Sequence, residues 1–387
     1  MTIGSSPDCP VVQEQRPRHP WRVRRQPDPT SFEEHGGPYQ PGFDLVHTDM
    51  LRYFTDLVND LGGDPRALML GVGIDPSLLA TGKATVSYRS MINLLEHAAT
   101  QLQCTDFGMR LASRQGGGQV FGPIGVVMKN SNTFGEGLDY VQKHFHAVSL
   151  VARMRFEQDR AGHKLFVGHE ILLERLVNKR QAVEQALLLG HLNALEITGG
   201  QARVREVLFR YQPLSSLSTY RRYFGCDVRF EQAEDGVVFS ERDLQSRTVD
   251  PDAQLYEMAT SFIDARFTRV APPMHIQVRA VILQLIGTED CGNERVAAEL
   301  CLHPRTLHRR LKVEGKSFEG IKDEVRRDVA LSYLQQTDLP LPLIAEKLGY
   351  AEHSVLSRSC FRWFCASPSQ LRSQTGRYGR DHRRAAG

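Results

Sequence analysis

A short stretch near the C-terminus, "HPRTLHRRLKVEG" (residues 303–315), carries the strongest chemical signal in the chain. Leu307 and Leu311 are four residues apart, so on a helix they would share one face. The outward face would then present four polar or cationic side chains: Arg305, His308, Arg309 and Lys312. Arginine forms paired hydrogen bonds with guanine edges in the major groove, and lysine neutralises phosphates. The stretch therefore predicts a DNA-binding helix, although a solvated basic helix would show the same pattern.

The residues before this stretch form the element that would position it. Val296, Ala297 and Leu300 would share one face of a short helix. Pro304 suits the first turn of the next helix, and Gly315 would end that helix. A short helix, a tight turn and a second helix with an apolar inner face make up the helix-turn-helix pattern. We therefore expect one helix-turn-helix unit that ends at Gly315.

The same pattern returns in "LPLIAEKLGYAEHSVLSRSCFRWF", residues 341–364. Gly349 occupies the turn, and the outward residues of the second helix would be Glu352, His353, Ser357 and Arg358. Residues 317–337 lie between the two units and are expected to form one helix of about 30 Å. Successive major grooves on one face of DNA are roughly 34 Å apart. A helical core with a charged surface is the alternative, and the repeat favours two DNA-binding units.

The overall composition is that of an ordinary globular protein. The length of 387 residues favours two domains, with hydrophobic and charged contents of 41% and 24%. No apolar run approaches the roughly 20 residues of a membrane helix, and the N-terminus has no apolar segment typical of a secretion signal. The seven cysteines include no CxxC pair, which favours reduced thiols and a cytoplasmic location.

Basic charge is concentrated toward the C-terminus. Residues 275–387 carry 18 lysines and arginines against 13 aspartates and glutamates, an excess of five. Because the whole chain has a net charge of +3, the remainder carries −2. A basic segment joined to a nearly neutral body is typical of a polyanion-binding module attached to another domain.

The hydrophobic pattern predicts a multidomain protein with an N-terminal α+β domain and an all-α domain. Prolines and arginines dominate residues 1–44, which indicates a disordered tail or a start site assigned too early. Two hairpins are expected, one turning at Arg160–Gly162 and one at Asp235–Gly236. Asp250 is expected to open a connecting helix. The expected parts are the disordered tail (1–44), an α+β effector-binding or dimerisation domain (45–245), a connecting helix and linker (246–274), the double helix-turn-helix domain (275–375) and a disordered basic tail (376–387).

Other candidate sites have weaker support. Four histidines could gather as metal ligands, but no cysteine or carboxylate completes a known spacing: His144, His146, His163 and His169. Cys360 and Cys365 could sense oxidants, although small buried apolar side chains are the better interpretation. The stretch "GGGQVFGPIG" lacks the Lys-Ser/Thr of a phosphate loop, and no nucleophile elbow is present. We therefore expect no metal, no cofactor and no enzymatic activity.

A small organic effector would need an apolar pocket with few polar groups in the N-terminal domain. The candidate wall residues are Phe121, Val126, Phe134, Tyr140 and Phe145. For each of these side chains, a place in the hydrophobic core is the better interpretation.

The tract from Val296 to Arg372 resembles the DNA-binding domain of the AraC/XylS family of bacterial transcription regulators. The motifs that carry the resemblance are "VAAEL", "PRTLHRRLKVEGKSF", "VRRDVALSYL", "LPLIAEKLGY", "FRWF" and "SPSQLR". Residues 45–245 resemble the ligand-binding domain that accompanies this module in one branch of the family. The resemblance implies a regulator that binds double-stranded promoter DNA and contacts RNA polymerase, with an N-terminal domain that senses a small organic effector, forms a homodimer, or does both. One alternative is an N-terminal domain that only dimerises and binds no effector; another is an enzyme with a DNA-binding tail.

The resemblance also assigns roles to individual residues. The base-reading candidates are Arg305, His308 and Arg309 in the first unit and Glu352, His353, Ser357 and Arg358 in the second; the phosphate-binding candidates are Arg310, Lys312 and Lys316. Phosphate contacts set affinity and salt dependence, whereas base contacts set sequence choice.

Several positions depart from the family pattern. His303 stands where a serine usually caps the first recognition helix. In the second unit, Leu356 and Cys360 replace two phenylalanines, and Phe361 replaces a basic residue. Cys365 replaces the glycine that usually follows the helix, and a non-glycine residue in a left-handed conformation there costs about 1 kcal/mol. We therefore expect the second unit to bind DNA less tightly than the first.

Overall fold

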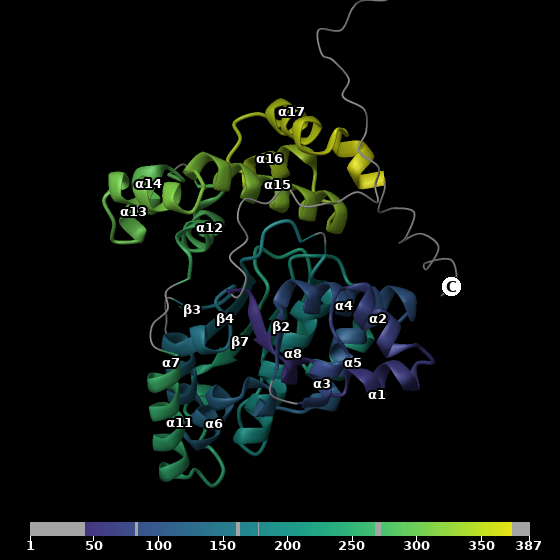
Figure 1. The fold of residues 1–387 in the computed structure, drawn as a ribbon, viewed down its shortest axis with the longest axis vertical. Helices are drawn as coiled ribbons and strands as arrows, with labels where there is room; N and C mark the ends of the chain where they lie inside the picture. The colour runs from purple at the N-terminus through teal and green to yellow at the C-terminus, as the bar shows by residue number, and fades with distance from the viewer. Residues whose placement is uncertain are drawn as a thin grey trace, which may run out of the picture. The chain divides into compact units, whose positions relative to one another are not determined.

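The computed structural model describes residues 43–81, 84–159, 163–176, 178–267, 272–288 and 290–373. Almost all of the expected N-terminal tail, and all of the expected C-terminal tail, lies outside these residues. The described chain consists of a mixed α and β segment followed by a wholly helical one, as Figure 1 shows by its colour gradient from purple to yellow. The expected order of an α+β part before an all-α part is therefore confirmed.

The mixed segment begins with a two-stranded ribbon and a group of helices. Strands β1 (Leu45–His47) and β2 (Thr85–Ser87) pair antiparallel. The helices around them are η1 (Thr48–Leu51), α1 (Phe54–Asp60), α2 (Pro65–Gly71), α3 (Ser77–Thr81), α4 (Tyr88–Gln101) and α5 (Phe107–Gln115). Local sequence explains where some of them start. The Asp64 carboxylate accepts hydrogen bonds from two N–H groups at the start of α2, and Ser87 caps α4 in the same way.

A five-stranded sheet forms the other part of this segment. Its strands are β3 (Ala152–Gln158), β4 (Lys164–Ile171), β5 (Glu206–Leu208), β6 (Asp227–Arg229) and β7 (Gly236–Ser240), in the spatial order β3-β4-β7-β5-β6. The first expected hairpin is confirmed, because β3 and β4 pair antiparallel. The turn residues Arg160–Gly162 themselves lie outside the described residues.

The second expected hairpin is wrong. Strand β6 pairs parallel with β5, and β7 pairs with β4 and β5 instead of with β6. Gly236 is the first residue of β7, where an added Cβ would lie 2.5 Å from the Phe166 ring. The Asp235 carboxylate is buried and accepts a hydrogen bond from the Arg210 N–H at 2.9 Å. This Asp-Gly pair thus leads into a central strand and is held by packing, so it does not form a hairpin turn.

Helices cover this sheet and connect it to the rest of the chain. They are η2 (Gly118–Phe121), α6 (Pro123–Asn130), α7 (Phe134–His144), η3 (Phe145–Ala147), α8 (Arg180–Ile197), α9 (Leu217–Phe224), α10 (Glu241–Leu244) and α11 (Ala253–Arg266). Helix α7 contacts β3, α8 contacts β4, and α11 packs on α6 (Figure 1). The connecting helix is capped by Asp252 and not by Asp250, which has a left-handed φ of 47°. Within the described residues, no helix is long and apolar enough to cross a membrane.

The helical segment contains α12 (Met274–Leu285), α13 (Asn293–Glu299), α14 (Pro304–Val313), α15 (Phe318–Gln336), α16 (Leu341–Lys347) and α17 (His353–Phe364). Its buried apolar residues form two clusters. One joins α12, α13 and α14 with the start of α15, and the other joins the end of α15 with α16 and α17. Each expected helix-turn-helix unit therefore has its own core, and α15 contributes to both.

Candidate nucleic-acid interface and apolar cavity

Helix α14 has the two faces that its sequence predicts. Leu307 and Leu311 are buried in the core of the first unit. His303 is the residue before the helix, and its Nδ1 accepts a hydrogen bond from the Arg305 N–H at 3.2 Å. The imidazole thus takes the capping role for which the family uses a serine, and Pro304 occupies the first turn.

The outward face of α14 forms part of a shallow, basic depression. Its lining residues are His303, Arg305, Thr306, His308, Arg309, Lys312, Lys316 and Ser317. These lining residues include four cations and no carboxylate. Arg310 is exposed on the same helix but lies outside the depression. The depression therefore gathers the three base-reading candidates of the first unit and two of the three phosphate-binding candidates.

Lys312 and Lys316 differ in their surroundings. Lys312 is exposed. The Lys316 side chain is only 24% exposed, and its ammonium lies 3.5 Å from a Glu324 carboxylate oxygen and 3.4 Å from one of Glu174. Because two carboxylates already neutralise Lys316, its charge is less available to a phosphate than that of Lys312.

The second recognition helix, α17, presents a less basic surface. Glu352 precedes the helix, and its carboxylate accepts a hydrogen bond from the Ser354 hydroxyl at 2.9 Å. His353 and Arg358 are exposed, whereas Ser357 is half-buried and donates to the His353 carbonyl at 3.3 Å. Among the four base-reading candidates of this unit, Arg358 is the one permanent cation.

The residues of α17 that depart from the family pattern differ in how deeply they are buried. Leu356 and Cys360 are fully buried in the core of the second unit. Burial raises the pKa of the Cys360 thiol to about 11, so the unreactive thiol form dominates at neutral pH. Phe361 is 65% exposed and therefore places an apolar ring on the surface where the family has a basic side chain.

Helix α15 is attached to both units. The Lys322 ammonium donates to the Cys291 carbonyl at 2.5 Å in the first unit. In the second unit, the Arg326 guanidinium donates to the Leu348 carbonyl at 3.0 Å, and the Trp363 indole N–H donates to Asp323 at 2.9 Å. The 19 residues of α15 span about 28 Å. These bonds make α15 a spacer that fixes the separation of the two units.

Left-handed residues occur at matching places in the two units. The residue after α17, Cys365, has a φ of 52°, which confirms the expected left-handed conformation. Gly315 takes this conformation after α14, with a φ of 66°. In the turns between helices, Cys301 has a φ of 53° and Gly349 one of 67°. Sequence reasoning missed the strain at Cys301, although comparing its turn with that of Gly349 would have revealed it.

The mixed segment encloses an apolar cavity of about 100 Å³ between α6, α7, α8 and the sheet. Phe121, Phe134 and Phe145, three of the five candidate wall residues, line this cavity. The other two candidates lie outside its lining: Val126 is 39% exposed, and the Tyr140 ring stacks on a histidine.

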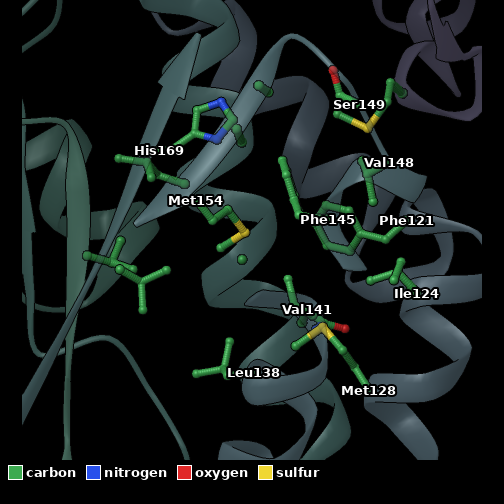
Figure 2. Close-up of a pocket in the computed structure, with 18 of the residues that line it drawn as sticks. Phe121, Ile124, Met128, Leu138, Val141, Phe145, Val148, Ser149, Met154 and His169 are labelled. Atoms are coloured by element: carbon green, nitrogen blue, oxygen red, sulfur yellow. The ribbon is translucent and has the colours of Figure 1, made fainter. Parts of the chain in front are cut away.

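Sequence reasoning missed the polar residues of the cavity, which include Ser149, His169 and Asn193. Figure 2 shows His169 and Met154 on strands of the sheet, across the cavity from the helical side chains. In the sequence of β4, His169 alternates with the buried residues Leu165 and Val167. This period of two places His169 on the inward face and was a signal available without the structure.

The four histidines considered as metal ligands have different surroundings. His169 lines the cavity, whereas the His163 side chain is 74% exposed and lies 3.5 Å from Glu241. The His144 ring stacks on Tyr140 at 4.0 Å between centroids, and His146 lies within 3.3 Å of the Phe267 carbonyl oxygen. His163 and His169 therefore do not share a site.

Comparisons with known proteins agree with this architecture. Residues 62–248 match the family model described as the arabinose-binding domain of AraC transcription regulator, and residues 296–374 match a helix-turn-helix domain model. The HTH-type transcriptional regulator VirS of Mycobacterium tuberculosis is 32% identical over 337 residues, which cover 87% of this chain and 98% of VirS. The chain belongs to the AraC family of helix-turn-helix transcription regulators.

Two regulators of Pseudomonas aeruginosa show lower identity to this chain. The ornithine utilization regulator of Pseudomonas aeruginosa is 24% identical, over 85% of this chain and 96% of that protein. The crystal structure of the transcriptional regulator CdpR from P. aeruginosa aligns with 83% of this chain and 98% of its own, with 18% identity and a TM-score of 0.40. The helix-turn-helix domain match and the relatives named as regulators, VirS above all, make this chain a DNA-binding transcription regulator and not an enzyme.

Proposed function

We propose that this regulator reads promoter DNA by placing α14 and α17 in successive major grooves. Arg305, His308 and Arg309 would contact bases in one groove, and Arg310, Lys312 and Lys316 would contact phosphates beside it. In the next groove the base contacts would come from Glu352, His353, Ser357 and Arg358. The observation that carries the proposal is the depression on α14, whose lining residues include four cations and no carboxylate.

Selection of bound sequences from a random DNA library tests this proposal. We expect the selected sites to contain two preferred blocks about 10 base pairs apart, one for each unit. Enrichment of a single block would contradict the role of α17. Sequences with no preferred block would contradict base reading altogether.

We also propose that a small organic effector in the apolar cavity controls DNA binding. An effector can shift the protein between two arrangements only if it binds them with different affinities. The cavity in the N-terminal segment, lined by aromatic and aliphatic side chains with few polar groups, supports this proposal. If the N-terminal domain only dimerises, as in the alternative, no small molecule will change both the melting temperature and the DNA affinity.

A second copy of this chain is the proposed partner of α11. Leu255, Met258 and Phe262 form one stripe along this helix and are 46%, 67% and 48% exposed. Asp252 and Arg266 flank the two ends of the stripe. An antiparallel pair of α11 helices would bury the stripe and bring the acid of one helix to the arginine of the other.

Sedimentation velocity tests the proposed homodimer. Met258→Glu, which puts a charge into the middle of the stripe, should convert a dimer to a monomer. Glu257→Gln on the adjacent face of α11 is the control and should leave the sedimentation coefficient unchanged. A dimer that survives Met258→Glu would place the interface elsewhere.

Family membership supports two further parts of the proposal: a site of action in the bacterial cytoplasm and activation through contact with RNA polymerase. Transcription from a selected promoter, reconstituted with purified polymerase, tests the second part. An increase in transcript with added regulator would support activation, and a decrease would identify a repressor.

A further inference from the structure

The cavity is lined by side chains that carry no permanent charge. Among its lining residues in the described chain there is no aspartate, glutamate, lysine or arginine. Its polar side chains are Tyr88, Ser149, His169 and Asn193, and the remainder is apolar. An ionised ligand would lose its hydration there without gaining a counter-charge, which is strongly unfavourable.

Two buried polar atoms of the lining residues lack a hydrogen-bond partner within the described chain. The Nε2 atom of His169 and the Oδ1 atom of Asn193 are buried and have no hydrogen-bond partner among the residues that the structure describes. The Ser149 hydroxyl accepts a hydrogen bond from the Val151 N–H at 3.2 Å and has an O–H that can donate to a ligand. Buried polar atoms without partners cost free energy, so a ligand that bonds to them gains from their pairing.

The imidazole of His169 is neutral at physiological pH. Burial, together with the positive charge of Lys179, lowers the pKa of His169 to about 4. A neutral imidazole donates from one ring nitrogen and accepts at the other, so Nε2 can pair with a hydroxyl or a carbonyl group. It offers no positive charge to a carboxylate.

A sugar does not suit this lining. Each hydroxyl of a monosaccharide needs hydrogen-bond partners once it is removed from water, and unpaired hydroxyls would oppose binding. With only four polar side chains among the described residues of a largely apolar wall, the hydroxyls of a monosaccharide could not each find both a donor and an acceptor. The description of the matching family model therefore does not predict the ligand of this chain.

We propose that the cavity binds an uncharged, mainly apolar molecule, with an aromatic ring or a short acyl chain and one hydroxyl or carbonyl group that hydrogen-bonds to Nε2 of His169. This inference rests on the proposed effector function and names the ligand class for it. The cavity of about 100 Å³ is somewhat smaller than an apolar cavity of roughly 150 Å³ that takes benzene. The cavity therefore limits the ligand to one small ring or a short chain with a single polar group.

Isothermal titration calorimetry of the full chain at pH 7.5 tests the ligand class with four probes built on one ring: toluene, benzyl alcohol, benzoate and benzylamine. L-Arabinose is the fifth probe. Benzyl alcohol should bind at least tenfold more tightly than benzoate or benzylamine, and more tightly than toluene. Arabinose should show no heat of binding. Tighter binding of arabinose or of either charged probe would overturn the proposal.

Two variants locate the binding site. His169→Phe should remove the advantage of benzyl alcohol over toluene. The control His163→Phe, at an exposed histidine outside the cavity, should preserve that advantage.

Gly190 lies on α8 and lines the cavity, and a Cβ added there would meet no heavy atom of the described chain within 4 Å. Gly190→Leu should therefore fill the cavity and abolish binding, without lowering the melting temperature of the free protein. Unchanged binding by both His169→Phe and Gly190→Leu would place the ligand elsewhere and overturn the proposal.

Experiments can contradict the proposed ligand class and the proposed effector control independently of each other. If benzyl alcohol binds as expected but operator affinity stays the same, the ligand class is supported and effector control is contradicted. If a charged or polyhydroxylated molecule binds in the cavity and shifts operator affinity, effector control is supported and the ligand class is wrong. Absence of binding by all five probes would contradict the ligand class, and a screen for molecules that change operator affinity would then decide effector control.

Discussion

The two helix-turn-helix units have the same helical plan but different surfaces. The recognition helix of the first unit lines a depression that contains four cations. Among the base-reading candidates of the second unit, Arg358 is the one permanent cation, beside Glu352, His353 and Ser357. Each unit has one cysteine and one glycine with a left-handed backbone, and the two residue types exchange places between the units. The first unit has Cys301 in its turn and a glycine after its recognition helix, while the second has a glycine in its turn and Cys365 after the helix.

The difference suggests a division of labour between the units. Phosphate contacts supply most of the affinity of DNA-binding proteins, and they require cations. The first unit carries those cations, so we expect it to dominate affinity. The second unit would mainly add sequence choice at a distance that α15 fixes. The following predictions test this comparison, starting with the largest expected effect.

Arg309→Ala should weaken binding to a selected operator by about 1–3 kcal/mol and relax the base preference at one position. The physical reason is the loss of paired hydrogen bonds to a base edge in the major groove. Titrations of the operator and of single-base variants measure both effects. Arg310→Ala, on the same helix but outside the depression, is the matched control and should reduce binding to all sequences by a similar small factor. If Arg309→Ala also weakens every sequence equally, the orientation of α14 in the groove is wrong.

Arg358→Ala should produce a smaller loss of affinity than Arg309→Ala. The affected base should lie about one helical turn from the position that Arg309 reads, because α15, which is about 28 Å long, is attached to both units. The same set of single-base operator variants provides the measurement. A larger loss for Arg358→Ala would reverse the assignment of the dominant unit.

Lys312→Ala should lower the slope of log affinity against log salt concentration by about one, because one phosphate contact is lost. Lys316→Ala is the comparison within the same depression. Its effect should be smaller, since Glu324 and Glu174 already lie within 3.5 Å of the Lys316 ammonium. Binding titrations at several salt concentrations measure the slopes. Equal slopes for both variants would show that these carboxylates do not reduce the role of Lys316.

Cys301→Gly and Cys365→Gly should each stabilise the protein by up to about 1 kcal/mol. Both cysteines have a left-handed backbone, which glycine adopts without strain. Urea denaturation, followed by tryptophan fluorescence, measures the free energy of unfolding. Gly315→Ala and Gly349→Ala are the reciprocal variants and should destabilise by a similar amount. Destabilisation by the cysteine-to-glycine changes would mean that packing of the thiols outweighs backbone strain.

Local sequence patterns predicted the helix-turn-helix units well. The alternation of Leu307 and Leu311 with cations, Pro304 at the first turn and Gly349 in the second turn all act over a few residues. Cys365 was recognised because a glycine position has a known backbone requirement. Such features depend little on the rest of the chain, so one sequence is enough to identify them.

Features that depend on distant parts of the chain were harder to predict. Asp235–Gly236 has the composition of a hairpin turn, yet β7 pairs with strands from elsewhere, and Gly236 is needed beside Phe166. The cavity also arises from the packing of separate helices against the sheet. Its aromatic walls were partly anticipated, but His169 was considered only as a metal ligand. The alternation along β4 predicted its inward direction, whereas the empty space beside it could not be derived from sequence.

The most direct test of the account is a footprint of the purified protein on a selected operator, for the wild type, Arg309→Ala and Arg358→Ala at two salt concentrations. We predict two protected patches about one helical turn apart in the wild type. Arg309→Ala should weaken both patches, because the first unit supplies most of the affinity, and Arg358→Ala should weaken one patch alone. A single patch that is insensitive to Arg358→Ala would contradict the claim that both units read DNA.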